Sequence, residues 1–96
     1  MHLDDLLREK RSEILQIAAE HGAYNVRIFG SVARGEADSS SDIDLLVEFK
    51  RGTTLLGHAA LIQELEDLLG VKVDVVSERS LRDRVKERVM REAVAL

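Results

Sequence analysis

A glycine–serine pair and two closely spaced carboxylates are the residues of this chain best suited to chemistry. Gly30 and Ser31 follow an apolar segment, and after ten further residues come Asp42 and Asp44, with one residue between them. The backbone N–H groups of a turn that begins with glycine and serine can hold a phosphate. Two carboxylates on one face of a strand suit a hard divalent cation such as Mg²⁺. A phosphate and a metal together indicate nucleotidyl transfer.

Two further residues can complete this group. Asp74 has the strand parity that would bring it beside Asp42 and Asp44, provided that their two strands are neighbours. Three carboxylates can hold two metal ions, or hold one and act as a base toward an attacking hydroxyl. Arg34, one turn after Ser31, can neutralise phosphate or pair with a nearby acid. The candidate catalytic and metal-binding residues are therefore Asp42, Asp44 and Asp74, and the candidate nucleotide-binding residues are Gly30, Ser31 and Arg34.

Each half of this pattern is weak by itself. A glycine–serine pair after a strand is commonly only a turn, and an Asp-x-Asp pair can lie at a solvated sheet edge. Carboxylates in a strand that continues as Leu-Leu-Val need a compensating partner, because an unpaired buried charge is costly. Three acids at strand positions, next to a turn suited to phosphate, together favour a functional site over an ordinary solvent-exposed sheet edge.

Hydrophobic periodicity predicts one α/β (α+β) domain over residues 1–96, with a three-stranded or slightly larger sheet flanked by helices. The expected helices are 3–21, 55–69 and a last helix that ends near 93, the expected strands are 26–29, 42–49 and 71–76, and 31–34 is expected to form a short helical turn. Gly22 and Gly70 are expected to end the first two helices.

Two helices are expected to bury apolar stripes. The stripe of 55–69 is expected to be Leu55, Ala59, Ile62, Leu65 and Leu69. Ser77 or Ser80 is expected to cap the last helix, whose stripe would be Leu81, Val85, Val89 and Ala93. The basic residues of this last helix, Arg88 among them, alternate with acids and are interpreted as a solvated face.

Composition excludes several classes of partner. The 96 residues carry a net charge of −4 and only three aromatic side chains, which argues against direct nucleic-acid binding. No apolar run approaches the ~18 residues that span a bilayer, and the N-terminus has no signal-peptide pattern. Without cysteine there is no disulfide framework. We therefore expect a cytoplasmic protein with no membrane contact.

The strings Phe-Gly-Ser-Val-Ala-Arg-Gly-Glu-Ala (29–37) and Ser-Asp-Ile-Asp-Leu-Leu-Val (41–47) resemble the signature of the DNA polymerase β-type nucleotidyltransferases, in particular their minimal branch. The ending Arg-Glu-Ala-Val-Ala-Leu (91–96) is similar to that branch too. The resemblance implies a compact fold with a small mixed sheet. It implies that Gly30 and Ser31 hold the triphosphate of ATP and that Asp42, Asp44 and Asp74 bind Mg²⁺.

The same resemblance implies a partner. Minimal nucleotidyltransferases resemble antitoxins paired with a HEPN-domain toxin, a helical ribonuclease, to which they transfer AMP at a hydroxyl. The predicted core leaves no residues for a separate acceptor domain, so the acceptor would be presented by another protein or a second copy. Two alternatives stay open: an antitoxin that acts by binding and occlusion alone, and a nucleotidyltransferase for a small-molecule hydroxyl.

Overall fold

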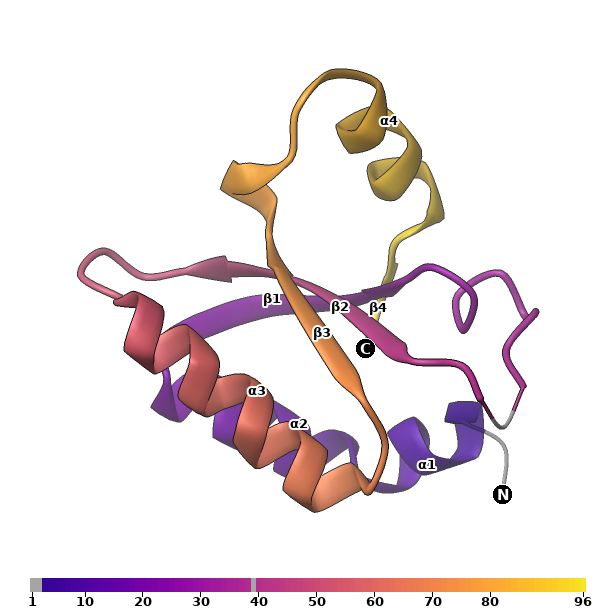
Figure 1. The fold of residues 1–96 in the computed structure, drawn as a ribbon, viewed down its shortest axis with the longest axis horizontal. Helices are drawn as coiled ribbons and strands as arrows, with labels where there is room; N and C mark the ends of the chain where they lie inside the picture. The colour runs from indigo at the N-terminus through magenta and orange to yellow at the C-terminus, as the bar shows by residue number, and fades with distance from the viewer. Residues whose placement is uncertain (1–2, 39) are drawn as a thin grey trace.

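A four-stranded mixed sheet separates two layers of helices (Figure 1). The computed structural model describes residues 3–38 and 40–96. The strands lie in the order β3-β2-β1-β4, with bounds β1 Ala23–Phe29, β2 Ile43–Phe49, β3 Val73–Ser77 and β4 Val94–Ala95. β2 is parallel to β3 and antiparallel to β1, and β1 is antiparallel to β4. The predicted small mixed sheet flanked by helices is confirmed.

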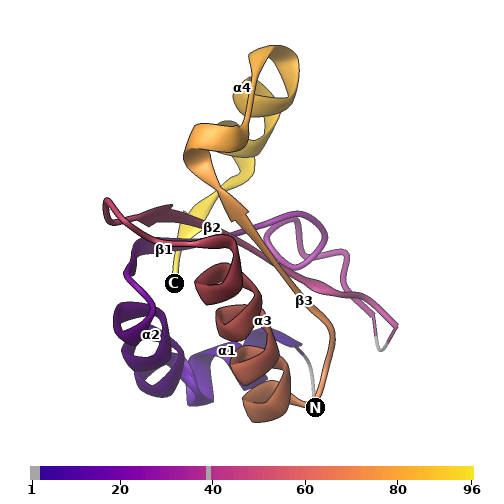
Figure 2. The ribbon, with the colours of Figure 1, turned by 60° about the vertical axis from the view of Figure 1, so that its left-hand side comes forward.

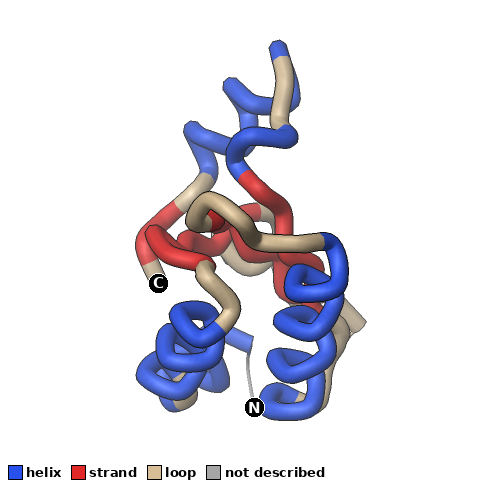
Figure 3. The backbone as a smooth tube through the Cα atoms, turned by 90° about the vertical axis from the view of Figure 1, so that its left-hand side faces the viewer, coloured by secondary structure: helices blue, strands red, loops and turns tan. Residues whose placement is uncertain are grey.

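The helices divide unequally between the two faces of the sheet. α1 (Leu3–Glu9), α2 (Arg11–Glu20) and α3 (Leu55–Leu69) cover one face, whereas the short 3₁₀ helix η1 (Glu78–Ser80) and α4 (Asp83–Glu92) lie on the other, as Figures 2 and 3 show. The main core lies under α1, α2 and α3 and includes Leu7, Ile14, Ile43, Leu45, Val47, Leu61 and Leu65. Among the described residues, no helix combines the length and the apolar character that a membrane crossing requires.

Because side chains alternate along a strand, β2 contributes side chains to both layers of the fold. Ile43, Leu45 and Val47 belong to the main core, as their spacing predicted. Asp44 and Leu46 face the layer of η1 and α4, and Leu46 is fully buried there. The face that carries the candidate carboxylates is therefore open at one end of the sheet and covered by α4 further along.

The expected helix over 3–21 is in fact two helices. A turn at Lys10, whose ψ is 9°, separates α1 from α2. Nothing in the sequence signals this break, because lysine is a good helix former and neither glycine nor proline is near. Gly22, at φ 77°, lies two residues beyond α2, after His21 at its C-cap.

The bounds of α3 are as predicted, but its apolar stripe is partly wrong. Thr54 caps its start by accepting the N–H of Gly57, and Gly70 ends it in the left-handed conformation. Leu61, Leu65 and Leu69 are buried. Leu55, in the first turn of the helix, is instead 87% exposed. Ala59 is exposed as well.

The C-terminal segment differs most from expectation. Neither serine caps α4: Ser80 lies in η1 and its hydroxyl donates to the Ser77 carbonyl, while Arg82 occupies the N-cap position of α4. Val89 is buried but Val85 is half exposed, so the expected stripe is only partly right. The strand β4 was not expected, because two residues show no periodicity that could identify them.

Candidate active site

The turn after β1 has the form that a phosphate-binding loop needs. Gly30 has φ 76°, which glycine adopts without strain, and its carbonyl accepts the N–H of Arg34 at 3.1 Å. The N–H of Glu36 donates to the Ser31 carbonyl at 2.9 Å, and Val32 anchors the turn in the core. These contacts form the compact turn that was expected over residues 31–34.

Gly30 is also required by its neighbour on β2. A Cβ placed on Gly30 would collide with the Asp44 Oδ2 and would come within 3.1 Å of the Asp44 Cγ. The absence of a side chain at Gly30 therefore makes room for the Asp44 carboxylate. The sequence had suggested close approach of a ligand as the reason for glycine, and the structure adds this packing requirement.

The strand register brings two candidate carboxylates together. Asp44 of β2 lies directly opposite Asp74 of the parallel neighbour β3, which confirms that their strands are adjacent. Asp42 stands one residue before β2, and Asp44 is the most buried of the three. A hollow of about 220 Å³ is lined by all three, together with Glu66, Lys72 and Val73.

The environment of Asp44 disfavours its charged form. Burial raises the pKa of the Asp44 carboxyl above its usual value, and the negative charges of Asp74 and Asp42 raise it further. The Arg34 guanidinium opposes these effects. A carboxylate that is half buried and faces two like charges is a group whose ionised form a cation would stabilise.

The donor chemistry fits a hard divalent cation. Carboxylate oxygens are the ligands that Mg²⁺ prefers, and Asp42, Asp44 and Asp74 lie at one end of the sheet. In the part of the chain that the structure describes, no three side chains form a preassembled metal site. The backbone register determines which residues meet, whereas side-chain rotamers determine how closely their oxygens approach.

A larger cavity of about 680 Å³ lies beside the carboxylates. Gly30, Ser31 and Arg34 line it from the turn, Asp42 and Asp44 line it from β2, and α4 supplies Arg88, Val89 and Glu92. Its volume is in the range of small-ligand pockets. Asp42 and Asp44 border both hollows, so the carboxylates stand between the space beside the phosphate turn and the space beside Asp74.

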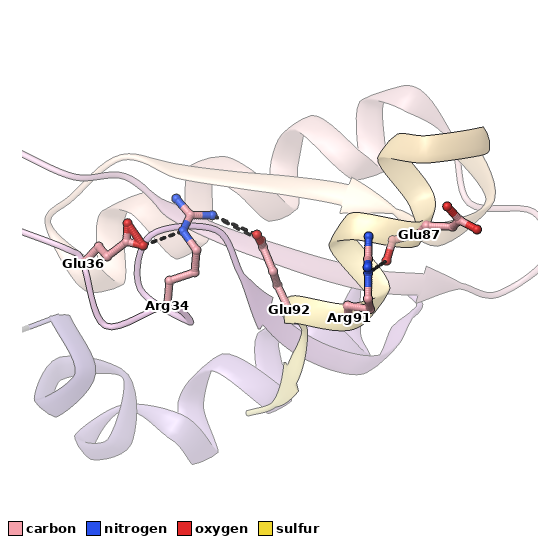
Figure 4. A network of polar contacts seen from close by, with 5 residues as sticks. All are labelled: Arg34, Glu36, Glu87, Arg91 and Glu92. Atoms are coloured by element: carbon pink, nitrogen blue, oxygen red, sulfur yellow. Dashed lines mark hydrogen bonds and ion pairs between the residues drawn. The ribbon is translucent and has the colours of Figure 1, made fainter.

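A carboxylate–guanidinium network joins the turn to α4 (Figure 4). The Arg34 Nε donates to Glu36 at 2.9 Å, and its Nη1 donates to both carboxylate oxygens of Glu92 at 3.2 Å. The hydrogen bonds that Arg34 donates to Glu36 and then to Glu92 raise the pKa of Arg34 above its usual value. Arg34 lines the larger cavity with two of its three guanidinium nitrogens already held by carboxylates.

Sequence reasoning missed the α4 wall of this cavity. The basic residues of α4 were interpreted as a solvated face, yet Arg88 and Glu92 line the cavity. The available signal was their spacing, because residues four apart flanking the buried Val89 share one helix face. Glu66 was also missed: its carboxylate accepts the Val73 N–H at 3.0 Å and so fixes the start of β3, one residue before Asp74.

Comparison with known proteins supports an enzymatic reading of this geometry. The sequence profile of the nucleotidyltransferase domain matches residues 9–96. A candidate protein adenylyltransferase of Methanocaldococcus jannaschii is 43% identical over 88 residues, which cover 92% of this chain and 95% of that protein. The protein adenylyltransferase MntA of Thermococcus cleftensis is 36% identical over 92 residues, covering 96% of this chain and 90% of that protein.

Solved structures share the fold. A candidate minimal nucleotidyltransferase, 57% identical, superposes with a TM-score of 0.88 and covers 100% of this chain and 97% of that one. A toxin–antitoxin complex with AMP-PNP superposes with a TM-score of 0.75 at 23% identity, and the match covers 88% of this chain and 69% of that one. A complex of a tri-AMPylated Shewanella oneidensis HEPN toxin with an MNT antitoxin has a TM-score of 0.70 at 20% identity. This match covers 92% of this chain and 69% of that one. The last two likenesses concern the fold alone.

The profile match over most of the chain and the relatives above 30% identity agree with the Gly-Ser and Asp-x-Asp pattern, and this chain belongs to the family of nucleotidyltransferase domains, in its minimal form.

Proposed function

We propose that this chain transfers AMP from ATP to a hydroxyl of a HEPN-domain toxin and thereby acts as the antitoxin that neutralises it. The observation that carries the proposal is the shared border between the two hollows. Asp42 and Asp44 separate a 680 Å³ cavity at the phosphate turn from the hollow that contains Asp74. A nucleotide and an acceptor can therefore approach the same two carboxylates from different sides.

The chemistry assigned to the site is an in-line transfer. The acceptor oxygen forms a bond to the α-phosphorus of ATP, the bond from that phosphorus to the oxygen bridging the β-phosphate breaks, and pyrophosphate leaves. Mg²⁺ held by Asp42, Asp44 and Asp74 would neutralise charge that develops on the phosphate oxygens. The proton of the acceptor hydroxyl passes to a carboxylate oxygen, and the exposed Asp74 lies on the acceptor side.

The residues of the turn orient the donor. The N–H groups after Gly30 and the Ser31 hydroxyl bind the triphosphate, and Arg34 adds positive charge at the wall of the cavity. The relatives named as protein adenylyltransferases support a protein acceptor. The solved complexes in which an MNT antitoxin accompanies a HEPN toxin support the choice of partner. With ATP as its donor, the proposed reaction would take place in the cytoplasm.

Intact mass spectrometry tests the proposal. The chain is incubated with ATP, Mg²⁺ and a HEPN-domain toxin. Each transfer should add about 329 Da to the partner, the mass of one AMP unit. Asp44→Asn should abolish the adduct, whereas Asp67→Asn should leave it intact. Asp67 is exposed on α3, pairs with Gln63 and lies outside both hollows.

Two outcomes would contradict transfer to the toxin. Neutralisation of the toxin without any adduct, equally by wild type and Asp44→Asn, would establish occlusion instead. Adducts on a small hydroxyl compound but not on the protein would establish a small-molecule acceptor. Formation of the adduct in the presence of a chelator would contradict the assigned metal requirement.

A further inference from the structure

The two arginines that line the larger cavity differ in their partners. Arg34 is held by Glu36 and Glu92, at 2.9 and 3.2 Å. Arg88 is exposed, and it forms none of the ion pairs found within residues 3–38 and 40–96. Arg34 therefore forms ion pairs within the protein, whereas Arg88 forms none among the described residues.

The pairing of Arg34 explains why Arg88 is free. Arg88 and Glu92 are four residues apart on α4, the spacing at which opposite charges pair on a helix. Both oxygens of Glu92 instead accept from the Nη1 of Arg34. The network that fastens α4 to the phosphate turn thus occupies the carboxylate four residues away on Arg88's own helix and leaves the five donors of Arg88 available.

The charge of the cavity lining indicates which ligand the Arg88 guanidinium suits. The lining residues include three carboxylates, those of Asp42, Asp44 and Glu92, against the two arginines. Without Arg88 the lining would hold three acids and one arginine that is already paired, a surface that repels a polyphosphate. Arginine binds phosphate oxygens through two parallel N–H groups, which suits a ligand opposite the turn.

We propose that Arg88 binds the phosphate chain of ATP from the α4 side of the cavity, opposite Ser31, and that the Arg34–Glu92 pair keeps α4 in place for this contact. The inference rests on the proposed function, since it assigns a residue to the nucleotide of that same site. It makes α4 the second wall of the nucleotide site, whereas the Gly-Ser turn and the strand carboxylates form the first.

Nucleotide titration tests this assignment without any transfer reaction. The affinity for ATP with Mg²⁺ is measured by calorimetry for wild type, Arg88→Gln, Arg88→Lys and Arg84→Gln. Arg84 is the matched control, because it is an exposed arginine one turn earlier on α4 and does not line the cavity. Circular dichroism and thermal unfolding confirm that each variant is folded.

Arg88→Gln should weaken ATP binding about tenfold at low salt, the loss expected for one charge-assisted contact to phosphate. The difference should shrink at high ionic strength, because salt screens an exposed contact. Arg88→Lys should retain part of the affinity and Arg84→Gln should bind within about twofold of wild type. Should Arg88→Gln fail to fold, Arg88→Lys should still bind ATP more weakly than wild type, whereas Arg84→Gln should not.

Equal ATP affinity of wild type and Arg88→Gln, both folded, would overturn the assignment while leaving the proposed function in place. An equal loss in Arg88→Gln and Arg84→Gln would also overturn it, because it would show only the general charge of α4. A wild-type chain that binds no ATP would overturn the proposed function together with this inference.

Discussion

Asp44 of β2 and Asp74 of β3 lie directly opposite each other in a parallel register, so two like charges face one another across adjacent strands. Asp42 adds a third charge nearby, and burial raises the pKa of Asp44 before these charges raise it further. Like charges held this close disfavour the folded chain at neutral pH, and a bound cation would relieve their repulsion.

The first prediction follows from the sign of this shift. Because the folded-state pKa of Asp44 is raised, its protonation favours the folded state below the unfolded value near 3.8, and that benefit is lost as pH rises through the folded pKa. In chelator at pH 7, Asp44→Asn should therefore unfold at a higher temperature than wild type. The difference should shrink as pH falls below about 4. Differential scanning calorimetry at both pH values measures it.

Asp67→Asn is the control, since this exposed carboxylate on α3 lies outside both hollows. Its effect on the melting temperature should be small and should not follow the pH pattern of Asp44→Asn. A melting temperature of Asp44→Asn at or below that of wild type in chelator would contradict the repulsion argument.

The second prediction separates the two reasons for glycine at position 30. Gly30 and Gly35 have nearly the same backbone angle, φ 76° and 74°, but a Cβ on Gly35 meets nothing within 4 Å. Gly35→Ala should therefore cost only the backbone strain, about 1–2 kcal/mol of unfolding free energy. Gly30→Ala should cost more, because its Cβ also collides with the Asp44 carboxylate. Urea unfolding measures both values.

A double substitution tests the collision itself. When Asp44→Ala removes the carboxylate, the added cost of Gly30→Ala over Gly35→Ala should largely disappear. If the additional cost persists without the carboxylate, the carboxylate is not its source, because Gly30 and Gly35 have nearly the same backbone angle. In that case the packing role assigned to Gly30 is wrong.

The third prediction concerns the link between the phosphate turn and α4. Glu92→Gln removes the charge that holds the Arg34 Nη1, in a pair whose side chains are 42% and 20% exposed. The cost in unfolding free energy should stay below about 1 kcal/mol, because such pairs are screened by solvent. Hydrogen exchange of the α4 amides should nevertheless accelerate, since this pair joins α4 to residues 58 positions away.

Glu87→Gln is the matched control for this prediction. Glu87 is exposed on the same helix, and only its backbone carbonyl forms the contact to Arg91 seen in Figure 4. Its substitution should leave α4 exchange unchanged. Equal exchange rates in Glu92→Gln and wild type would show that packing of Val89 alone holds the helix.

How much of this site the sequence predicts depends on how far apart in the chain the contacting residues are. Strand parity is local, so Asp42, Asp44 and Asp74 could be assigned to one face from residue spacing. A helix between β2 and β3 makes their parallel pairing the expected connection. Asp44 and Asp74 therefore meet as predicted, and the family resemblance pointed to the same residues.

Local reasoning of this kind can place Arg88 and Glu92 on one face of α4, but it cannot place that face against the cavity. Arg34 and Glu92 are 58 residues apart, and nothing near either residue indicates the other. The basic pattern of α4 is the same whether its arginines face solvent or a ligand. The strand β4 is too short to show alternation, and it holds the C-terminal segment against β1 beside Arg27.

The last prediction concerns Arg27, the buried charged residue beneath α4. Its side chain is 11% exposed and pairs with Glu78 of η1 at 3.2 Å, while its Nε donates to the Asn25 carbonyl. Its Nη2 has no partner within the described residues. Removing the counter-charge with Glu78→Ala should cost about 2–3 kcal/mol of unfolding free energy, because it leaves a buried cation unpaired. Glu78 keeps some solvent exposure, which holds the cost below that of a fully buried pair.

The double variant Arg27→Met with Glu78→Ala should be more stable than Glu78→Ala alone, because the apolar replacement leaves no uncompensated charge under α4. The exposed pair of Lys10 and Glu13, 3.8 Å apart, provides the contrast. Glu13→Ala should change the unfolding free energy by less than about 1 kcal/mol. Chemical denaturation of the four proteins makes the comparison. If the double variant is no more stable than Glu78→Ala, then Arg27 stabilises the α4 layer by its packing and its bond to Asn25 rather than by the ion pair.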